Sequence, residues 1–274
     1  MSVPVKSVTI DGRRLAYREA GSGPPIVFLH GLGGNSGSWE PQFAAFSNSH
    51  RVVAWDMPGF GCSNLPVIPA ATTRDFSALA RRFMDALAIE HAVGIATSYG
   101  TVILADLAQS NPGLISAMVF SCGVTGMGHL APQERARLRA VRRADIESVG
   151  QRKFAELRNS TYVAKGMSAA LVARVIELAG SAQPEGYLQA YGALTEFNIF
   201  NSLGRIDVPA LVLAGADDPI AAARDCERVA RALRQAEYRC IQNSGHYLNL
   251  EQPETFNRLV GTFLARVAQD APRT

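Results

Sequence analysis

The 274-residue sequence lacks the features that would assign it to a metal-binding or disulfide-rich class. It has only four cysteines, at positions 62, 122, 226 and 240, with no Cys-x-x-Cys pair and no partner histidines at metal-site spacing. A zinc module and a disulfide framework are therefore excluded, and we expect no metal. Four scattered thiols are typical of a reducing compartment, so we expect a cytoplasmic protein.

Long hydrophobic runs and a strong charge imbalance are also missing. Apolar stretches such as 26–29 and 210–214 have the length of a strand and are too short to cross a membrane. The first ten residues have no basic segment followed by an apolar one, so we expect no signal peptide. A net charge of +3 without an arginine- and lysine-rich stripe predicts no nucleic-acid partner. We expect a monomer or homodimer acting on a small molecule.

What the sequence does have is hydrophobic periodicity, with 47% hydrophobic and 19% charged residues. The dipeptide Asp11-Gly12 predicts a hairpin between two alternating runs. Strand-like and helix-like segments then alternate. The strand-like ones are 26–29, 51–55, 91–95, 115–120, 209–214 and 238–241, and the helix-like ones are 39–46, 76–87, 101–109, 221–233 and 253–268. This alternation predicts an α/β fold with a mostly parallel sheet flanked by helices on both faces.

The alternation is interrupted between residues 124 and 200. Helical patterns cover 131–144, 145–158, 168–181 and 184–197, with no strand-like run among them. We therefore expect a core domain made of residues 1–123 and 201–274, with residues 124–200 inserted as a helical cap. A helical insert in a parallel sheet is typical of a lid over a pocket.

Residues 96–100, Ala-Thr-Ser-Tyr-Gly, join a strand-like run to a helix-like run. A serine at such a turn is exposed as a nucleophile, and the tight turn requires small residues two positions before and after it, here Ala96 and Gly100. The start of the following helix favours developing negative charge. The pattern indicates Ser98 as a nucleophile, although an ordinary strand–helix connection has the same appearance.

A serine nucleophile needs a base, and a parallel sheet presents such groups at the carboxyl ends of its strands. Of the five histidines, His246 alone follows the last predicted strand. His50 and His91 precede strands, His129 lies in the connection to the insert, and His30 is expected to shape the glycine-rich loop that follows it. We predict His246 as the base.

The orienting acid is expected after the strand 209–214, where Asp217 and Asp218 are adjacent. Successive side chains point in different directions, so only one of the two can face His246. The chain order serine, aspartate, histidine is that of the hydrolases which present serine on a strand–helix turn.

The segment His30-Gly-Leu-Gly-Gly-Asn-Ser-Gly37 has two interpretations. It follows a strand and opens a helix, as a dinucleotide-binding loop does, and Asp56 ends the next strand. However, Ser36 stands where that motif has its third glycine, and Asp56 leads into a turn-rich loop. We favour a loop whose backbone N–H groups face an oxyanion, and we expect no cofactor.

Together, His30-Gly-Leu-Gly-Gly34, Asp56-x-Pro-Gly-Phe-Gly-x-Ser63, the 96–100 turn, Gly-Ala-Asp-Asp218 and Gly-His246 resemble the α/β-hydrolase superfamily over residues 5–268. The resemblance implies an α/β-hydrolase fold with a helical cap insert. It implies Ser98 as nucleophile, Asp218 rather than Asp217 as acid, and His246 as base. It also implies an oxyanion hole formed by the backbone N–H groups of Leu32 and Tyr99.

Within that superfamily, the segments 203–215 and 142–150 are similar to 3-oxoadipate enol-lactone hydrolases. This similarity implies a serine hydrolase that cleaves a small carboxylic ester or lactone through an acyl-enzyme on Ser98. Ala96 replaces the first glycine usual in the turn, and Tyr247 replaces the tryptophan typical of carbon–carbon-cleaving relatives. The alternatives are a carbon–carbon bond hydrolase, a non-hydrolytic catalyst (acyltransferase, or cofactor-free lyase or oxygenase), and an inactive ligand-binding relative.

Four arginines of the insert, at 135, 139, 142 and 143, have the spacing to share one helix face. Nearby acids at 134, 145 and 147 favour a solvated face with balanced charge. The other interpretation is that the face attracts a carboxylate of the substrate.

Overall fold

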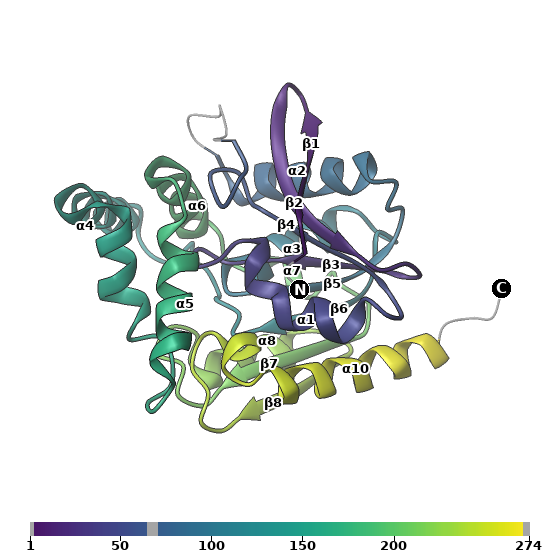
Figure 1. Cartoon of the computed structure of the whole chain (residues 1–274). Helices are drawn as coiled ribbons and strands as arrows, with labels where there is room; N and C mark the ends of the chain where they lie inside the picture. The colour runs from purple at the N-terminus through teal and green to yellow at the C-terminus, as the bar shows by residue number, and fades with distance from the viewer. Residues whose placement is uncertain (1–2, 65–70, 271–274) are drawn as a thin grey trace.

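A central eight-stranded sheet organises the molecule in the computed structural model, which describes residues 3–64 and 71–270. The strand order is β1-β2-β4-β3-β5-β6-β7-β8 (Figure 1). The strands are β1 (Val5–Ile10), β2 (Arg13–Ala20), β3 (Pro25–Leu29), β4 (Arg51–Trp55), β5 (Ala92–Thr97), β6 (Ile115–Ser121), β7 (Ala210–Gly215) and β8 (Ala236–Ile241). All pairs from β4 to β8 are parallel, while β2 pairs antiparallel with β1 and β4. The predicted mostly parallel sheet is confirmed.

The hairpin between β1 and β2 turns at the predicted dipeptide. Asp11 and Gly12 have φ values of 49° and 72°, and Ile10 pairs with Arg13 across the turn. Two positive φ angles in a two-residue loop match the right-handed twist of the flanking strands, which is why Asp-Gly is favoured there.

Helices cover both faces of the sheet, so the central strands β3 to β7 are apolar along most of their length. In Figure 1, α1 and α10 lie in front of the sheet, and α2 and α3 lie behind it. Trp39, Trp55 and Phe256 are fully buried in the resulting core. The helices outside the insert are η1 (Ser36–Trp39), α1 (Glu40–Phe46), α2 (Thr73–Ala86), α3 (Tyr99–Ser110), α7 (Phe200–Leu203), α8 (Ala223–Ala232), α9 (Leu248–Glu251) and α10 (Pro253–Asp270).

Between β6 and α7, the chain carries the helices α4 (Pro132–Asn159), α5 (Ala169–Gly180) and α6 (Pro184–Glu196), which stand together at one side of the sheet (Figure 1). The sequence predicts a helix boundary at residues 144 and 145, but α4 continues through it. The break falls at Gly150, whose φ of 76° and ψ of 157° are not helical. Residues 144 and 145 contain no helix breaker, whereas glycine adopts positive φ without a steric penalty.

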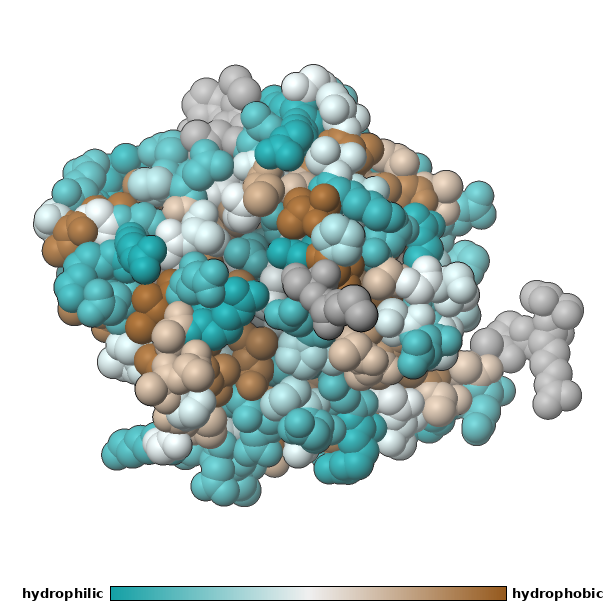
Figure 2. Space-filling view, in the orientation of Figure 1, coloured by the Kyte–Doolittle hydropathy of each residue, from teal (hydrophilic) through white to brown (hydrophobic). Residues whose placement is uncertain are grey.

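The outer surface is mainly polar on the face drawn in Figure 2, where brown apolar patches are small and separated by teal residues. Exposed apolar side chains on α4 include Val141, Val149 and Leu157. Among the described residues, no helix combines the length and the apolar character that crossing a membrane requires.

Candidate active site

Ser98 lies at the turn from β5 into α3, with a φ of 52° and a ψ of −124°. This strained backbone persists because the turn is packed closely by neighbouring backbone. A Cβ on Gly100 would lie 2.2 Å from the carbonyl oxygen of Leu29, and a Cβ on Gly31 would lie 2.5 Å from the Ser98 Cβ. Only glycine fits at these two positions, and the serine hydroxyl is held at the carboxyl edge of the sheet.

A chain of hydrogen bonds joins Ser98 to the two other residues predicted to be catalytic. His246 Nε2 lies 3.0 Å from Ser98 Oγ, and His246 Nδ1 lies 2.8 Å from Asp218 Oδ2. The imidazole is nearly buried, and the Asp218 carboxylate is completely buried. With its proton on Nδ1, His246 presents an unprotonated Nε2 to the serine hydroxyl, which is the arrangement of a general base.

The two adjacent aspartates after β7 have different surroundings. The Oδ1 of Asp218 accepts hydrogen bonds from the backbone N–H groups of Ile220 at 2.7 Å and Ala221 at 2.9 Å, while its Oδ2 faces His246. Asp217 is exposed, and its backbone N–H donates to the carbonyl oxygen of Ser244. Asp218 is therefore the member of the pair that the structure brings to the histidine.

The predicted oxyanion donors flank Ser98. Leu32 lies in the loop after β3 and lines the same cavity as the serine hydroxyl, and Tyr99 is the first residue of α3. The backbone N–H groups of both residues have no hydrogen-bond partner within residues 3–64 and 71–270. Unpaired N–H groups on both sides of a nucleophile suit a negatively charged oxygen.

His30 holds the loop that contains Leu32. Its Nδ1 lies 2.8 Å from the carbonyl oxygen of Gly31, and its Nε2 accepts the backbone N–H of Met57. The ring is fully buried, and burial lowers the pKa of His30. His30 shapes the loop, as expected from the sequence.

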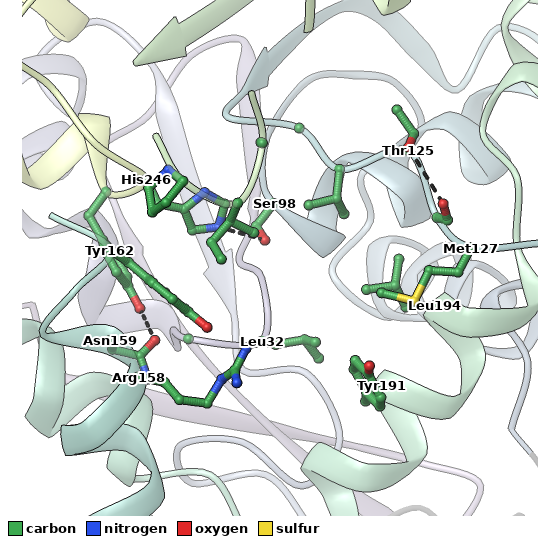
Figure 3. Close-up of a pocket in the computed structure, with 18 of the residues that line it drawn as sticks. Leu32, Ser98, Thr125, Met127, Arg158, Asn159, Tyr162, Tyr191, Leu194 and His246 are labelled. Carbon is green, nitrogen blue, oxygen red and sulfur yellow. Dashed lines mark hydrogen bonds between the residues drawn. The ribbon is translucent and has the colours of Figure 1, made fainter. Parts of the chain in front are cut away.

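A cavity of about 400 Å³ opens above Ser98 and His246. Residues from the insert form much of its wall, and Figure 3 shows Tyr162, Met127, Tyr191 and Leu194 around the space that the serine and histidine face. This volume is within the usual range of small-molecule sites, about 300–1,000 Å³. Aromatic rings from Phe154, Tyr162, Tyr187, Tyr191 and Tyr247 line it.

Two arginines of α4 line the cavity. The Arg142 guanidinium lies 4.1 Å from the ring centroid of Tyr191 and donates a hydrogen bond to the hydroxyl of Tyr187. Arg158 lies over the rings of Phe154 and Tyr162, and its guanidinium extends into the cavity toward Leu32 (Figure 3). No ion pair joins either arginine to a carboxylate in the described part of the chain. Burial raises the pKa of Tyr187, so its hydroxyl is neutral.

The other arginines of the predicted basic face are neutralised on the outside of the insert. Arg135 and Arg139 form ion pairs with Glu196, and Arg143 lies within 4 Å of carboxylate oxygens of Glu147 and Glu185. These three arginines are balanced by carboxylates, as the first interpretation expects, but of the acids it named only Glu147 is a partner, and Glu134 pairs with Arg137 instead. Arg142 faces the cavity and does not belong to this surface.

Sequence reasoning did not single out Arg158 or Asn159. Asn159, at the end of α4, accepts a hydrogen bond from the hydroxyl of Tyr247. The sequence predicts that this stretch is helical, but the helical pattern does not show which face of the helix lines the cavity.

One group of side chains in the described residues has the composition of a metal site. Ligand atoms of Cys122, Asp218 and His246 lie within 4.8 Å of one another. The His246 and Asp218 atoms are already joined by a hydrogen bond, and burial raises the pKa of the Cys122 thiol well above its usual range. A neutral thiol is a poor metal ligand, because metals bind the thiolate.

Comparison with known proteins agrees with this architecture. The family model described as the alpha/beta hydrolase fold matches residues 24–253. The chain is 29% identical over 265 residues to an (E)-2-((N-methylformamido)methylene)succinate hydrolase from Acinetobacter baylyi, covering 94% of this chain and 97% of the relative. It is 27% identical over 250 residues to 3-oxoadipate enol-lactonase 2 of the same organism, covering 89% of each.

A solved structure has the same fold. The enol-lactonase from Burkholderia xenovorans LB400 superposes with a TM-score of 0.84 at 24% identity, covering 95% of this chain and 100% of that one. Because the family model matches residues 24–253, which is most of the sequence, this chain belongs to the α/β-hydrolase fold family.

Proposed function

We propose that the protein is a serine hydrolase that cleaves a small carboxylic ester or lactone through an acyl-enzyme on Ser98. The observation that carries the proposal is the hydrogen-bonded chain from Ser98 through His246 to the buried Asp218, at the floor of an aromatic cavity. The names of the relatives, a succinate-type hydrolase and an enol-lactonase, support the same reaction class.

In the first half of the reaction, Ser98 Oγ attacks the carbonyl carbon while His246 Nε2 takes the hydroxyl proton. The resulting imidazolium is stabilised by Asp218 through the Nδ1–H bond. The carbonyl oxygen becomes negative and accepts hydrogen bonds from the backbone N–H groups of Leu32 and Tyr99. Collapse of this intermediate breaks the bond to the leaving oxygen, which receives the proton from His246.

In the second half, a water molecule gives a proton to His246 and attacks the acyl carbon. The bond to Ser98 Oγ then breaks, the serine recovers its proton, and the carboxylic acid leaves. For a lactone, the leaving oxygen belongs to the same molecule, so a single hydroxy acid is released.

We assign residues 124–200 as a cap domain over the cavity and residues 1–123 and 201–274 as the core domain, since both segments line the cavity.

The substrate that fits this cavity best carries a carboxylate besides the bond that is cleaved. Arg142 and Arg158 provide positive charge inside the cavity, and neither forms an ion pair within the described residues. The one carboxylate among the described residues that line the cavity, Asp225, pairs with Arg228 at 3.0 Å. Guanidinium groups bind carboxylates through paired N–H donors. Of the relatives described above, one has succinate in its name and one has 3-oxoadipate, and both of these compounds are dicarboxylates.

The proposal is tested with p-nitrophenyl esters and small lactones, each assayed with the wild type and with Ser98→Ala. We expect turnover by the folded Ser98→Ala variant to fall by ~10³ or more, as when a triad nucleophile is lost. A fluorophosphonate should label Ser98 in the wild type and leave the variant unlabelled. If the folded variant keeps more than about a tenth of the wild-type rate, which corresponds to a loss of only ~1.4 kcal/mol in transition-state stabilisation, Ser98 is not the nucleophile.

The preference for an acidic substrate is tested separately with Arg142→Gln and Arg158→Gln. We expect KM for an ester with a free carboxylate to rise about tenfold or more in each variant, the loss of one charged hydrogen-bonded contact, with little change for a matched neutral ester. Arg137→Gln is the matched control, because Arg137 pairs with Glu134 on the exposed side of the same helix. Equal effects on both esters would contradict carboxylate recognition.

A further inference from the structure

The loop that carries His246 is held by groups outside the hydrogen-bonded chain of the site. The backbone N–H groups of Gly245 and Tyr247, on either side of the histidine, donate to the two carboxylate oxygens of Glu251 at 2.7 and 2.9 Å. The N–H of His246 itself donates to the carbonyl oxygen of Tyr162 at 2.7 Å. Three successive N–H groups are therefore held by acceptors that lie outside the loop.

The same carboxylate also binds the insert. Glu251 Oε2, which accepts from Gly245, accepts a second hydrogen bond from the backbone N–H of Ala164 at 2.9 Å. Ala164 belongs to the segment that follows α4, two residues after Tyr162. One side chain on α9 thus spans the histidine loop and the insert.

These two backbone segments are in direct contact. A Cβ on Gly245 would lie 2.4 Å from the carbonyl oxygen of Tyr162 and 2.7 Å from the nitrogen of Ala164. Glycine is required there because no side chain fits between the segments. A shift of the insert at residues 162–164 therefore moves the backbone next to His246.

We infer that Glu251 is a positioning residue that fixes the place of His246 relative to Ser98 and links it to the insert. This inference rests on the proposed function, in which His246 takes the serine proton. A carboxylate suits the role because it offers two acceptor oxygens and no donor, and its bonds to N–H groups are charge-assisted. Glutamine at this position would turn an NH₂ group toward at least one backbone N–H.

The test is the kinetics of Glu251→Gln on a p-nitrophenyl ester that the wild type cleaves. We expect kcat to fall by ~10–100-fold, because a displacement of about 1 Å between reacting groups costs that much, and KM to stay unchanged because Glu251 does not line the cavity. The matched control is Glu254→Gln, three residues further along. Glu254 is exposed and has no hydrogen bond or ion pair with the described residues, so its variant should match the wild type.

A loss of folded protein is separated from a loss of positioning by end-point titration with a fluorophosphonate, which counts competent sites. We expect Glu251→Gln to reach the wild-type end point but to be labelled more slowly, in proportion to its kcat. If Glu251→Gln has the same kcat per titrated site as the wild type, the inference is overturned. It is also overturned if only KM changes.

Glu251→Asp distinguishes position from charge. The shorter side chain keeps the negative charge but cannot reach all three donors, so we expect a fall in kcat as well. Full wild-type activity in this variant would show that charge alone matters and would overturn the positioning role. Failure of the wild type to be labelled at Ser98 would instead refute the proposed function.

Discussion

Replacing Asp218 by asparagine should remove nearly all activity, while the same change at Asp217 should have little effect. The reason lies in how Asp218 is bound. Its Oδ1 accepts two backbone N–H groups, from Ile220 and Ala221, and its Oδ2 accepts the Nδ1–H of His246. In Asp218→Asn, the amide oxygen has to serve the two backbone donors, so the NH₂ group faces His246.

An NH₂ group opposite Nδ1 favours the wrong tautomer of the imidazole. Nδ1 becomes the acceptor, the proton moves to Nε2, and Nε2 then points a proton at Ser98 instead of a lone pair. We expect kcat to fall by ~10⁴, the loss known when the orienting acid of a serine triad is made neutral. This corresponds to about 5.4 kcal/mol of activation free energy at ~1.36 kcal/mol for each factor of ten.

Asp217→Asn is the matched control, since it is the same chemical change one residue away. The Asp217 side chain is exposed, and the hydrogen bond that holds this position is made by its backbone N–H, which the substitution keeps. We expect less than a tenfold loss, under about 1.4 kcal/mol. Both variants should be assayed at one pH on one ester, with folding checked by circular dichroism. A larger loss in Asp217→Asn, or a loss below tenfold in Asp218→Asn, would refute this reasoning.

Three further predictions concern charge and thiols. Raising the salt concentration should increase KM for an acidic lactone more than for a neutral ester, because mobile ions screen the half-buried Arg142 and Arg158; identical salt responses would contradict a role for these arginines. A thiol reagent such as Ellman's reagent should titrate only the exposed Cys62 and Cys240 in the native protein, with the two buried thiols reacting after unfolding. Burial raises the pKa of Cys226 from 9.0 to about 12, so the unfolded chain loses this proton first and the free energy of unfolding should fall between about pH 9 and 12. Urea titrations across that range check the slope, which should be smaller in Cys226→Ala.

The sheet and its helices were predictable because each element carries its own periodic signal. Apolar runs such as 51–55 and 115–120 are buried on both faces of a parallel sheet, and their bounds in the structure agree within one residue. The one-turn helices α7 and α9 were not predicted, because four residues are too few for a period of 3.6 to be recognised.

The positions of Ser98, His246 and the aspartate pair were also readable, because a parallel sheet brings the carboxyl ends of its strands to one edge. The structure brings Ser98 and Asp218 each within hydrogen-bond distance of His246. Their catalytic roles remain a proposal, which the variants above test.

The sequence by itself determined the order of strands and helices, the small residues at the serine turn, and the chain order of the candidate groups, because these depend on local periodicity and local steric limits. Tertiary structure decided which arginine enters the cavity. A helical spacing shows which residues share a face, but it does not show where that face points. The packing of α4 against α5 and α6, together with its break at Gly150, turns Arg142 toward the cavity. The hydrogen bonds of Glu251 to the histidine loop and the insert could not be predicted from the sequence either. Its three hydrogen-bond donors come from two segments about 80 residues apart in the sequence, and only folding brings them to one carboxylate.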